Sequence, residues 1–265
     1  MPPRPGTGRR VSERAIVVGV LLAASLGIAG AIGRATAVWS NAGHDPRGGT
    51  LTGYDRMAVE VAVGLTGIEP SSDRYRQYQA DVVSFSGKYY THRLATFLHV
   101  LPSALLFLLA PLQFSPHLRS RHIRFHRWSG RLILVSAAAS GLSGFFFGAI
   151  PFAGVPETVA AWGFGSLFLF AAGRAFVAIR HKDVSRHREW MIRMLAVAIG
   201  ISTIRVVDLI MFGAFEMTAR MAFGFSIWIG WLATVAAAEV WIRATRPRVS
   251  PSHGAVPPLS TASAA

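Results

Sequence analysis

The chain has 265 residues, of which 52% are hydrophobic and only 15% are charged, whereas a soluble domain is usually about a quarter charged. Its formal net charge is +14, its mean hydropathy is +0.40 and it has no cysteine. The lack of cysteine excludes disulfides, thiolate nucleophiles, cysteine-bound zinc and iron–sulfur clusters. The apolar composition excludes an ordinary soluble enzyme and a disordered basic tail, and it predicts an integral membrane protein.

Six segments are long and apolar enough to cross a hydrocarbon core, which takes roughly 20 residues. We therefore predict an all-α bundle of six transmembrane helices: Ala15–Val38, Leu94–Phe114, Trp128–Ile150, Val155–Ile179, Trp190–Phe212 and Met221–Ile242. The last five belong to a predicted five-helix transmembrane core over residues 92–243. The first could instead be a secretory signal behind Arg9 and Arg10, but its apolar stretch of about 20 residues favours an uncleaved anchor.

The basic residues predict how this bundle is oriented. With both termini in the cytoplasm, 18 Lys and Arg residues lie inside, eight lie outside and Arg205 lies within a span. Cytoplasmic loops of membrane proteins carry such an excess of bases. We expect a multi-pass protein of the plasma (inner) membrane, N-in and C-in, in contact with the lipid bilayer. Nucleic-acid binding is disfavoured, because the bases are divided among four short segments.

Three segments are predicted to lie outside the membrane. Residues 1–14 form a basic cytoplasmic tail, and residues 244–265, rich in Pro, Ser, Ala and Thr, form a disordered cytoplasmic tail. Residues 39–91 form an extracytoplasmic segment that contains all five tyrosines and a short apolar stretch, Met57–Leu65. We expect this segment to cap the bundle rather than to form a substrate-binding domain.

Ionisable residues in the outer half of the spans are costly in lipid and therefore informative. His92 and His99 are seven residues apart, which puts them on one face of the second span. Arg205 and Asp208, three apart on the fifth span, can pair with each other. His99 and Arg205 lie at similar predicted depth, so they could share a pocket if the second and fifth spans are neighbours.

Two similar motifs open the third and fifth spans at the inner side: residues 126–131 (HRWSGR) and residues 187–193 (HREWMIR). Each has a His-Arg pair, a Trp and an Arg one turn further, which suggests a parallel repeat of spans three–four and five–six. Interfaces also collect these residue types, and that explains the tryptophans well. It explains Arg131 and Arg193 less well, and Glu239 on the sixth span is a plausible partner for one of them.

Proline and glycine predict local features of two spans. Pro111 is expected to kink or end the second span, so that Gln113 presents its amide near the inner histidines. Gly27, Gly30 and Gly33 on the first span favour close helix packing.

The strings Pro111–Phe114 (PLQF), Arg124–Arg131 (RFHRWSGR) and His187–Arg193 (HREWMIR), followed by Arg205, resemble the domain-of-unknown-function 2306 family of predicted membrane proteins. The resemblance covers roughly residues 92–210. It implies a multi-span, bacterial-type membrane protein with no established activity. It also implies importance for His99, His126, Arg131, His187, Arg193 and Arg205.

The first functional hypothesis is a membrane redox protein that binds b-type haem or quinone. Without cysteine, histidine is the natural axial ligand, and His126 and His187 lie at one depth on different spans. Arg131 and Arg193 would pair with the propionates. A quinone or a small anion would bind between His99 and Arg205.

Two other classes remain open. A transporter or a lipid- or small-anion-binding protein would use a cavity lined by Arg205, Asp208 and His99. In a structural or assembly protein the same residues would only fix the bundle. Hydrolase chemistry is disfavoured, because the Gly-x-Ser-x-Gly, HExxH and phosphate-loop motifs are absent from the sequence.

Overall fold

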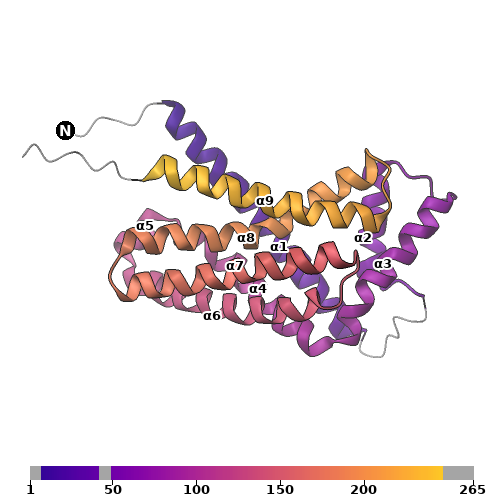
Figure 1. Cartoon of the computed structure of the whole chain (residues 1–265), viewed down its shortest axis with the longest axis horizontal. Coiled ribbons are helices and arrows are strands. Elements are labelled where there is room, and N and C mark those ends of the chain that lie inside the picture. Colours follow the sequence, from indigo (N-terminus) through magenta and orange to yellow (C-terminus); the bar gives the residue numbers. More distant parts are fainter. Residues whose placement is uncertain (1–6, 42–48, 247–265) are drawn as a thin grey trace, which may run out of the picture.

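The computed structural model describes residues 7–41 and 49–246, and every regular element in these ranges is a helix (Figure 1). The helices are α1 (Thr7–Ser40), α2 (Gly53–Thr66), α3 (Asp73–Thr91), α4 (Arg93–Gln113), α5 (Pro116–Arg121), α6 (Ile123–Gly148), α7 (Val155–Arg180), α8 (Val184–Gly213) and α9 (Ala219–Thr245). Six of them, α1, α4, α6, α7, α8 and α9, are long and apolar enough to span a membrane. This confirms the predicted all-helical protein with six spans.

The observed spans extend beyond their predicted apolar cores. Helix α6 begins five residues before Trp128 and α8 begins six residues before Trp190. These added turns contain the His-Arg pairs. Because the pairs are polar, a hydropathy pattern does not include them in the predicted spans. Helix α1 likewise begins at Thr7, within the predicted basic tail. The first six residues of that tail, and positions 247–265 of the predicted C-terminal tail, lie outside the described residues.

Side-chain caps define where several helices begin. Thr52, Ser72, Ser115 and Thr218 each accept a hydrogen bond from the backbone amide three residues ahead, at the starts of α2, α3, α5 and α9. Such caps satisfy amides that have no partner in the first turn of a helix. Helix α2 ends at Gly67 with φ 69°, a left-handed conformation that glycine adopts without steric cost.

Five of the spanning helices form a closed ring. Neighbours around the ring are α1, α4, α6, α7, α8 and then α1 again, and α9 packs along the outside of α8 and also touches α7. Apolar side chains of α4, α6, α7 and α8 fill the interior, including Leu106, Ile133, Phe168 and Met194. The second and fifth spans, α4 and α8, are thus separated on one side by α1.

The glycines of α1 allow this helix to join the ring. A Cβ atom at Gly27 would lie 2.7 Å from the Phe107 ring of α4, and one at Gly33 would lie 2.2 Å from the Tyr54 ring of α2. Both distances are too short for a real contact. The first span therefore packs closely through its glycines, as the sequence predicted.

The two ends of the bundle differ in structure. Helices α2 and α3 lie across one end, which we call the cap end, and α5 and the α7–α8 turn lie at the other, the arginine end (Figure 1). Because the number of spans is even, the described ends of the chain, Thr7 and Arg246, both belong to the arginine end.

Candidate functional site

His126 of α6 and His187 of α8 approach each other at the arginine end. Each comes from the first turn or two of its helix, and α7 packs between the two helices. Nδ1 of His187 lies 2.9 Å from the carbonyl oxygen of Ala175 on α7. A backbone acceptor at this distance fixes Nδ1 as the protonated nitrogen and leaves the Nε2 lone pair available.

His126 is placed differently. Its Nδ1 is buried and has no hydrogen-bond partner among the described residues. The ring lies within range of the charge of His187 and of two arginines, Arg119 and Arg127. Unsatisfied buried nitrogens are uncommon in proteins, and each one asks for a physical explanation. The two predicted haem ligands are therefore close to each other, and one of them carries an unused polar atom.

The end of α4 forms one wall beside these histidines. Helix α4 ends at Gln113, two residues after Pro111, and the Gln113 amide donates to Ser129 Oγ at 2.7 Å. Ser129 is fully buried, three residues after His126. The Gln113 amide thus lies near the histidine level, as the sequence suggested.

The two motif arginines differ in their surroundings. Arg193 binds Glu239 of α9 through two hydrogen bonds, at 2.5 and 3.0 Å, and its guanidinium lies 4.6 Å from the centre of the Trp190 ring. The predicted partnership of Glu239 is therefore with Arg193. Arg131 is exposed on α6, and no hydrogen bond or ion pair joins it to any described residue.

His99 belongs to a polar contact between α4 and α6. Its Nδ1 lies 2.9 Å from the Ser140 carbonyl oxygen and 3.4 Å from Ser143 Oγ, and its ring packs edge-on against Phe147. Ser103 and Ser140 share a hydrogen bond of 2.5 Å beside it. These contacts are those of a packing residue that joins two helices.

Arg205 and Asp208 of α8 are not joined by a direct ion pair within the described structure. The guanidinium of Arg205 lies against Gly30 of α1, while Asp208 lies near Tyr78 of α3 and its Oδ1 is buried without a hydrogen-bond partner. The structure also does not bring His99 and Arg205 together. Helix α1 lies between α4 and α8, so the two side chains face different neighbours.

The cap end contains a buried ion pair that the sequence analysis missed. Arg34 of α1 lies 3.0 Å from Asp55 of α2, with side chains 13% and 3% exposed. Asp55 also accepts hydrogen bonds from Thr52, Ser86 and Tyr90, at 2.8, 2.7 and 2.9 Å. The only sequence signal was the balance of acids and bases in residues 39–91, which gives no pairing.

Two further ion pairs hold α3 against the spans. Lys88 lies 3.2 Å from Glu157 of α7, and two backbone amides of the α6–α7 loop donate to Glu157 at 2.6 and 2.7 Å. Arg220 of α9 lies 3.3 Å from Asp81 of α3. The predicted role of residues 39–91 as a cap on the bundle agrees with these contacts.

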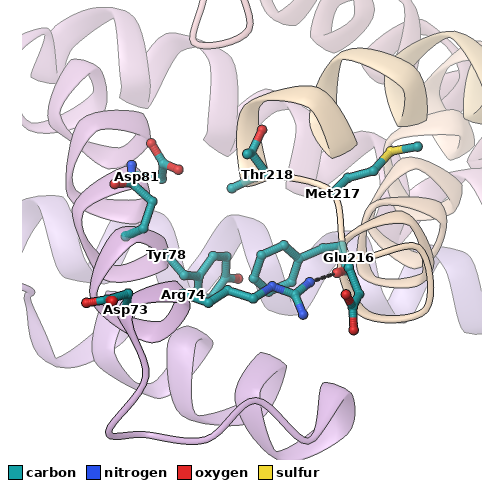
Figure 2. A pocket seen from close by; sticks show the side chains of 10 residues that line it. Asp73, Arg74, Tyr78, Asp81, Glu216, Met217 and Thr218 are labelled. Carbon is teal, nitrogen blue, oxygen red and sulfur yellow. Dashed lines mark hydrogen bonds between the residues drawn. The ribbon is translucent and has the colours of Figure 1, made fainter.

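A cavity of ≈ 320 Å³ lies between α3 and the α8–α9 loop (Figure 2). The Tyr78 ring stacks on Phe212 at 4.4 Å between centroids, and Arg74 donates to the Phe212 carbonyl oxygen. Figure 2 shows Arg74 reaching from α3 toward the loop that carries Glu216. Burial, with a contribution from the charge of Asp208, raises the pKa of Tyr78 to about 12.

No group of three or more His, Asp or Glu side chains in the described ranges could hold a metal ion.

A family model described as "Predicted membrane protein (DUF2306)" matches residues 96–242. Searches of curated proteins and of solved structures gave no match. The matched region includes both histidine motifs and reaches to α9, beyond the roughly 92–210 that the sequence resemblance covered. Since the match spans more than half of the chain, this protein belongs to the DUF2306 family of predicted membrane proteins.

Proposed function

We propose that this protein is a membrane redox protein that would hold b-type haem at its arginine end through His126 and His187. The observation that carries the proposal is the pair of neighbouring imidazoles: Nδ1 of His126 is buried without a hydrogen-bond partner among the described residues, and Nδ1 of His187 contacts the Ala175 carbonyl oxygen. Bound haem would supply one-electron transfer.

The orientation of His187 supports this role. Ligating histidines usually donate their other ring N–H to a carbonyl or carboxylate, which sets the ring plane and increases the basicity of the ligand. The Ala175 carbonyl oxygen, 2.9 Å from Nδ1, occupies that position.

The arginines divide into two groups under this proposal. Arg193 is already paired with Glu239, so it is a poor partner for a propionate. Arg119 and Arg127 lie close to His126, and Arg131 is exposed one turn further along α6. We assign propionate binding to Arg131 with help from Arg119 or Arg127, because planar guanidinium groups pair well with carboxylates.

We further propose that the arginine end faces the cytoplasm and that the protein resides in the plasma (inner) membrane. The excess of bases at that end supports this orientation. The quinone form of the hypothesis has less support, because Nδ1 of His99 already contacts the Ser140 carbonyl and Arg205 faces another helix.

The test is an absorption spectrum of the full chain, purified in detergent after haem-replete expression, in oxidised and dithionite-reduced forms. We expect a Soret band and a reduced α band. His187→Ala and His126→Ala should each abolish or strongly weaken both bands, whereas the control His181→Ala, an exposed histidine in the α7–α8 turn, should retain them. A wild-type protein without a haem spectrum, or a spectrum that survives loss of both ligands, rejects the proposal.

Transport at the cap end is a second candidate function, and Asp208 is the observation that favours it. Oδ1 of Asp208 is buried without a hydrogen-bond partner among the described residues, and Asp208 lies near Tyr78, which lines the cavity, so the carboxylate is suited to binding a proton or small cation. Reconstituted protein should then carry a proton or cation flux that Asp208→Asn abolishes and that Glu60→Gln, at an exposed position on α2 outside the cavity lining, leaves intact. Equal flux in both variants, or none in the wild type, rejects this candidate.

A further inference from the structure

We propose that Arg205 and the adjoining surfaces of α1 and α8 form a binding site for the phosphate headgroup of an anionic phospholipid. This site, which we call the Arg205 site, consists of Gly30, Tyr54 and Arg205 with the exposed apolar residues beside Arg205 on α8. It is independent of the proposed haem site, which lies at the opposite end of α8.

The first observation is an exposed charge without a partner. Arg205 lies inside a span and is exposed, yet none of the described residues forms a hydrogen bond or an ion pair with its guanidinium. Asp208, three residues further along, lies within electrostatic range of both Arg205 and Tyr78 but forms no ion pair with Arg205 in the described structure. An arginine in a span nearly always finds an anionic or polar partner, because an isolated charge in hydrocarbon is costly. The partner must therefore come from outside the described chain.

The second observation is that the guanidinium of Arg205 packs against Gly30 of α1. A Cβ atom at Gly30 would lie 3.3, 3.5 and 3.9 Å from Nη2, Cζ and Nε of Arg205, so the group lies along α1 where that helix has no side chain. The Tyr54 hydroxyl of α2 donates to the Gly30 carbonyl oxygen at 3.3 Å, so Tyr54 lies at the end of the site nearer the cap. A larger residue at position 30 would displace the guanidinium.

The third observation is the depth of the group. Ser202 of α8 donates to the Ala23 carbonyl oxygen of α1 at 2.7 Å, which sets the two helices in register. From that level Arg205 is three residues further toward the cap end and Gly30 is seven residues further, or about 4.5 and 10 Å at the helical rise. The side chain of Arg205 therefore extends about 6 Å toward the cap end.

This extension brings the charge to headgroup level. Helix α8 has 30 residues and a length of about 45 Å, compared with a hydrocarbon core of about 30 Å, so a centred α8 projects about 7 Å at each end. The Cα atom of Arg205 is eight residues, or about 12 Å, from the end of α8 at Gly213. A guanidinium about 6 Å beyond that Cα lies close to the edge of the core, where lipid phosphates lie.

The fourth observation is the apolar surface around the charge. Ile201, one helical turn before Arg205 on α8, is 36% exposed, and Val206, the next residue after Arg205, is 51% exposed. An exposed apolar surface next to a single cation matches an amphiphile, with acyl chains on the isoleucine and valine side chains and a phosphate on the guanidinium. Arginine donates two parallel hydrogen bonds to phosphate, which makes this pairing strong.

The test is native mass spectrometry of the full chain released from nanodiscs that contain equal parts of phosphatidylcholine and phosphatidylglycerol. We expect wild-type protein to retain phosphatidylglycerol in preference to phosphatidylcholine. Arg205→Gln should weaken the retained phosphatidylglycerol about tenfold, as expected for loss of charge-assisted hydrogen bonds. Arg180→Gln, which removes an exposed arginine at the end of α7, should retain it.

A second pair of variants tests the site without removing the charge of Arg205. Gly30→Ala should reduce phosphatidylglycerol retention, because the added Cβ atom crowds the guanidinium, whereas Gly19→Ala on the same helix meets no atom within 4 Å and should have no effect. Retention that is equal for the two lipids, or unchanged in both Arg205→Gln and Gly30→Ala, overturns the proposal. Displacement of the lipid by inorganic phosphate would instead reveal a site for a free anion and would also overturn it.

Discussion

Asp55 illustrates how a single carboxylate can organise a membrane protein outside its spans. It receives hydrogen bonds from Thr52, Ser86 and Tyr90 and an ion pair from Arg34, so elements α1, α2 and α3 meet at one side chain. Because the side chain is only 3% exposed, its charge depends on these partners. Removal of one member of a buried ion pair leaves the other as an uncompensated charge.

We therefore expect Asp55→Ala to lower the free energy of unfolding by about 3–5 kcal/mol. The matched control is Asp73→Ala, which removes a pair with Arg76 in which the two side chains are 95% and 64% exposed. That change should cost less than about 1 kcal/mol, since water screens exposed pairs. Denaturant titration in mixed micelles measures both values, and similar losses for the two variants would contradict the structural role given to Asp55.

Tyr90 of the same network gives the protein a pH-dependent stability. Burial, aided by the charge of Asp55, raises the pKa of Tyr90 to about 12. In the unfolded chain the hydroxyl ionises near its usual pKa of about 10. Between these values the unfolded chain releases a proton that the folded protein retains, so stability must fall as the pH rises through this window.

We expect the free energy of unfolding to decline as the pH rises from about 10 toward 12, and the decline to be smaller in Tyr90→Phe. The measurement is denaturant unfolding at several alkaline pH values for both proteins. If the free energy of unfolding fell equally with pH in the two proteins, folding would not raise the pKa of Tyr90 and the prediction would be wrong.

At the scale of elements, α8 and α9 form the closest helix pair of the bundle. Gly200 of α8 receives the Trp231 ring, and a Cβ atom at Gly230 of α9 would lie 2.8 Å from the Ile204 backbone nitrogen. A backbone atom cannot move aside as the end of a flexible side chain can. Close approach at Gly230 also brings Glu239 of α9 into reach of Arg193.

Gly230→Ala should therefore destabilise the protein by about 1–3 kcal/mol, the usual cost of added volume in a packed interface. Gly173→Ala on α7 is the control, because a Cβ atom there meets nothing within 4 Å. It should leave stability unchanged or raise it by about 0.5–1 kcal/mol, since alanine is the better helix former. A stability loss of equal size in the two would show that backbone propensity, not the α8–α9 contact, governs the result.

The elements also show what the sequence could predict. The six spans follow from the lengths of the apolar segments. The Arg193–Glu239 partnership follows from the similar depth of the two residues along the membrane normal, and hydropathy reports both quantities directly. Lateral neighbours depend on side-chain shape, about which hydropathy says nothing. For that reason the sequence could not place α1 between α4 and α8, and it left open whether His99 and Arg205 share a pocket.

The cap was harder to predict for a related reason. Its helix α2 is short and its helix α3 is polar, so a search for long apolar segments does not find them. The Arg34–Asp55 pair forms only when α2 and α3 fold back onto α1. The contacts of Arg34 with Ser86 and Tyr90 join residues more than 50 positions apart. Residues 39–91 contain both acids and bases, but their sequence does not indicate which of them pair.

At the scale of the whole molecule, the distribution of bases predicts the orientation of the bundle. Eighteen of the 27 basic residues belong to segments assigned to the arginine end. The natural chain has no cysteine, so single cysteines can report topology without a background. Ser71 in the cap and Ser185 near the start of α8 are both exposed and suit this purpose.

We expect Ser71→Cys to react with a membrane-impermeant maleimide in intact cells and Ser185→Cys to react only after lysis. The unmodified chain, which cannot react, is the control. The reverse pattern would invert the assigned orientation and with it the cytoplasmic location of the proposed haem site.

The contact between α1 and α8 also constrains how the molecule is made. The hydrogen bond from Ser202 to the Ala23 carbonyl joins residues 179 positions apart, and it completes the helix ring. During synthesis α1 enters the bilayer before the other described spans, yet its glycine-lined surface meets its last ring partner only after α8 has followed. Helix α1 must therefore stay partly uncovered until four more spans, α4, α6, α7 and α8, have inserted, and factors that shield a nascent helix would act on this surface.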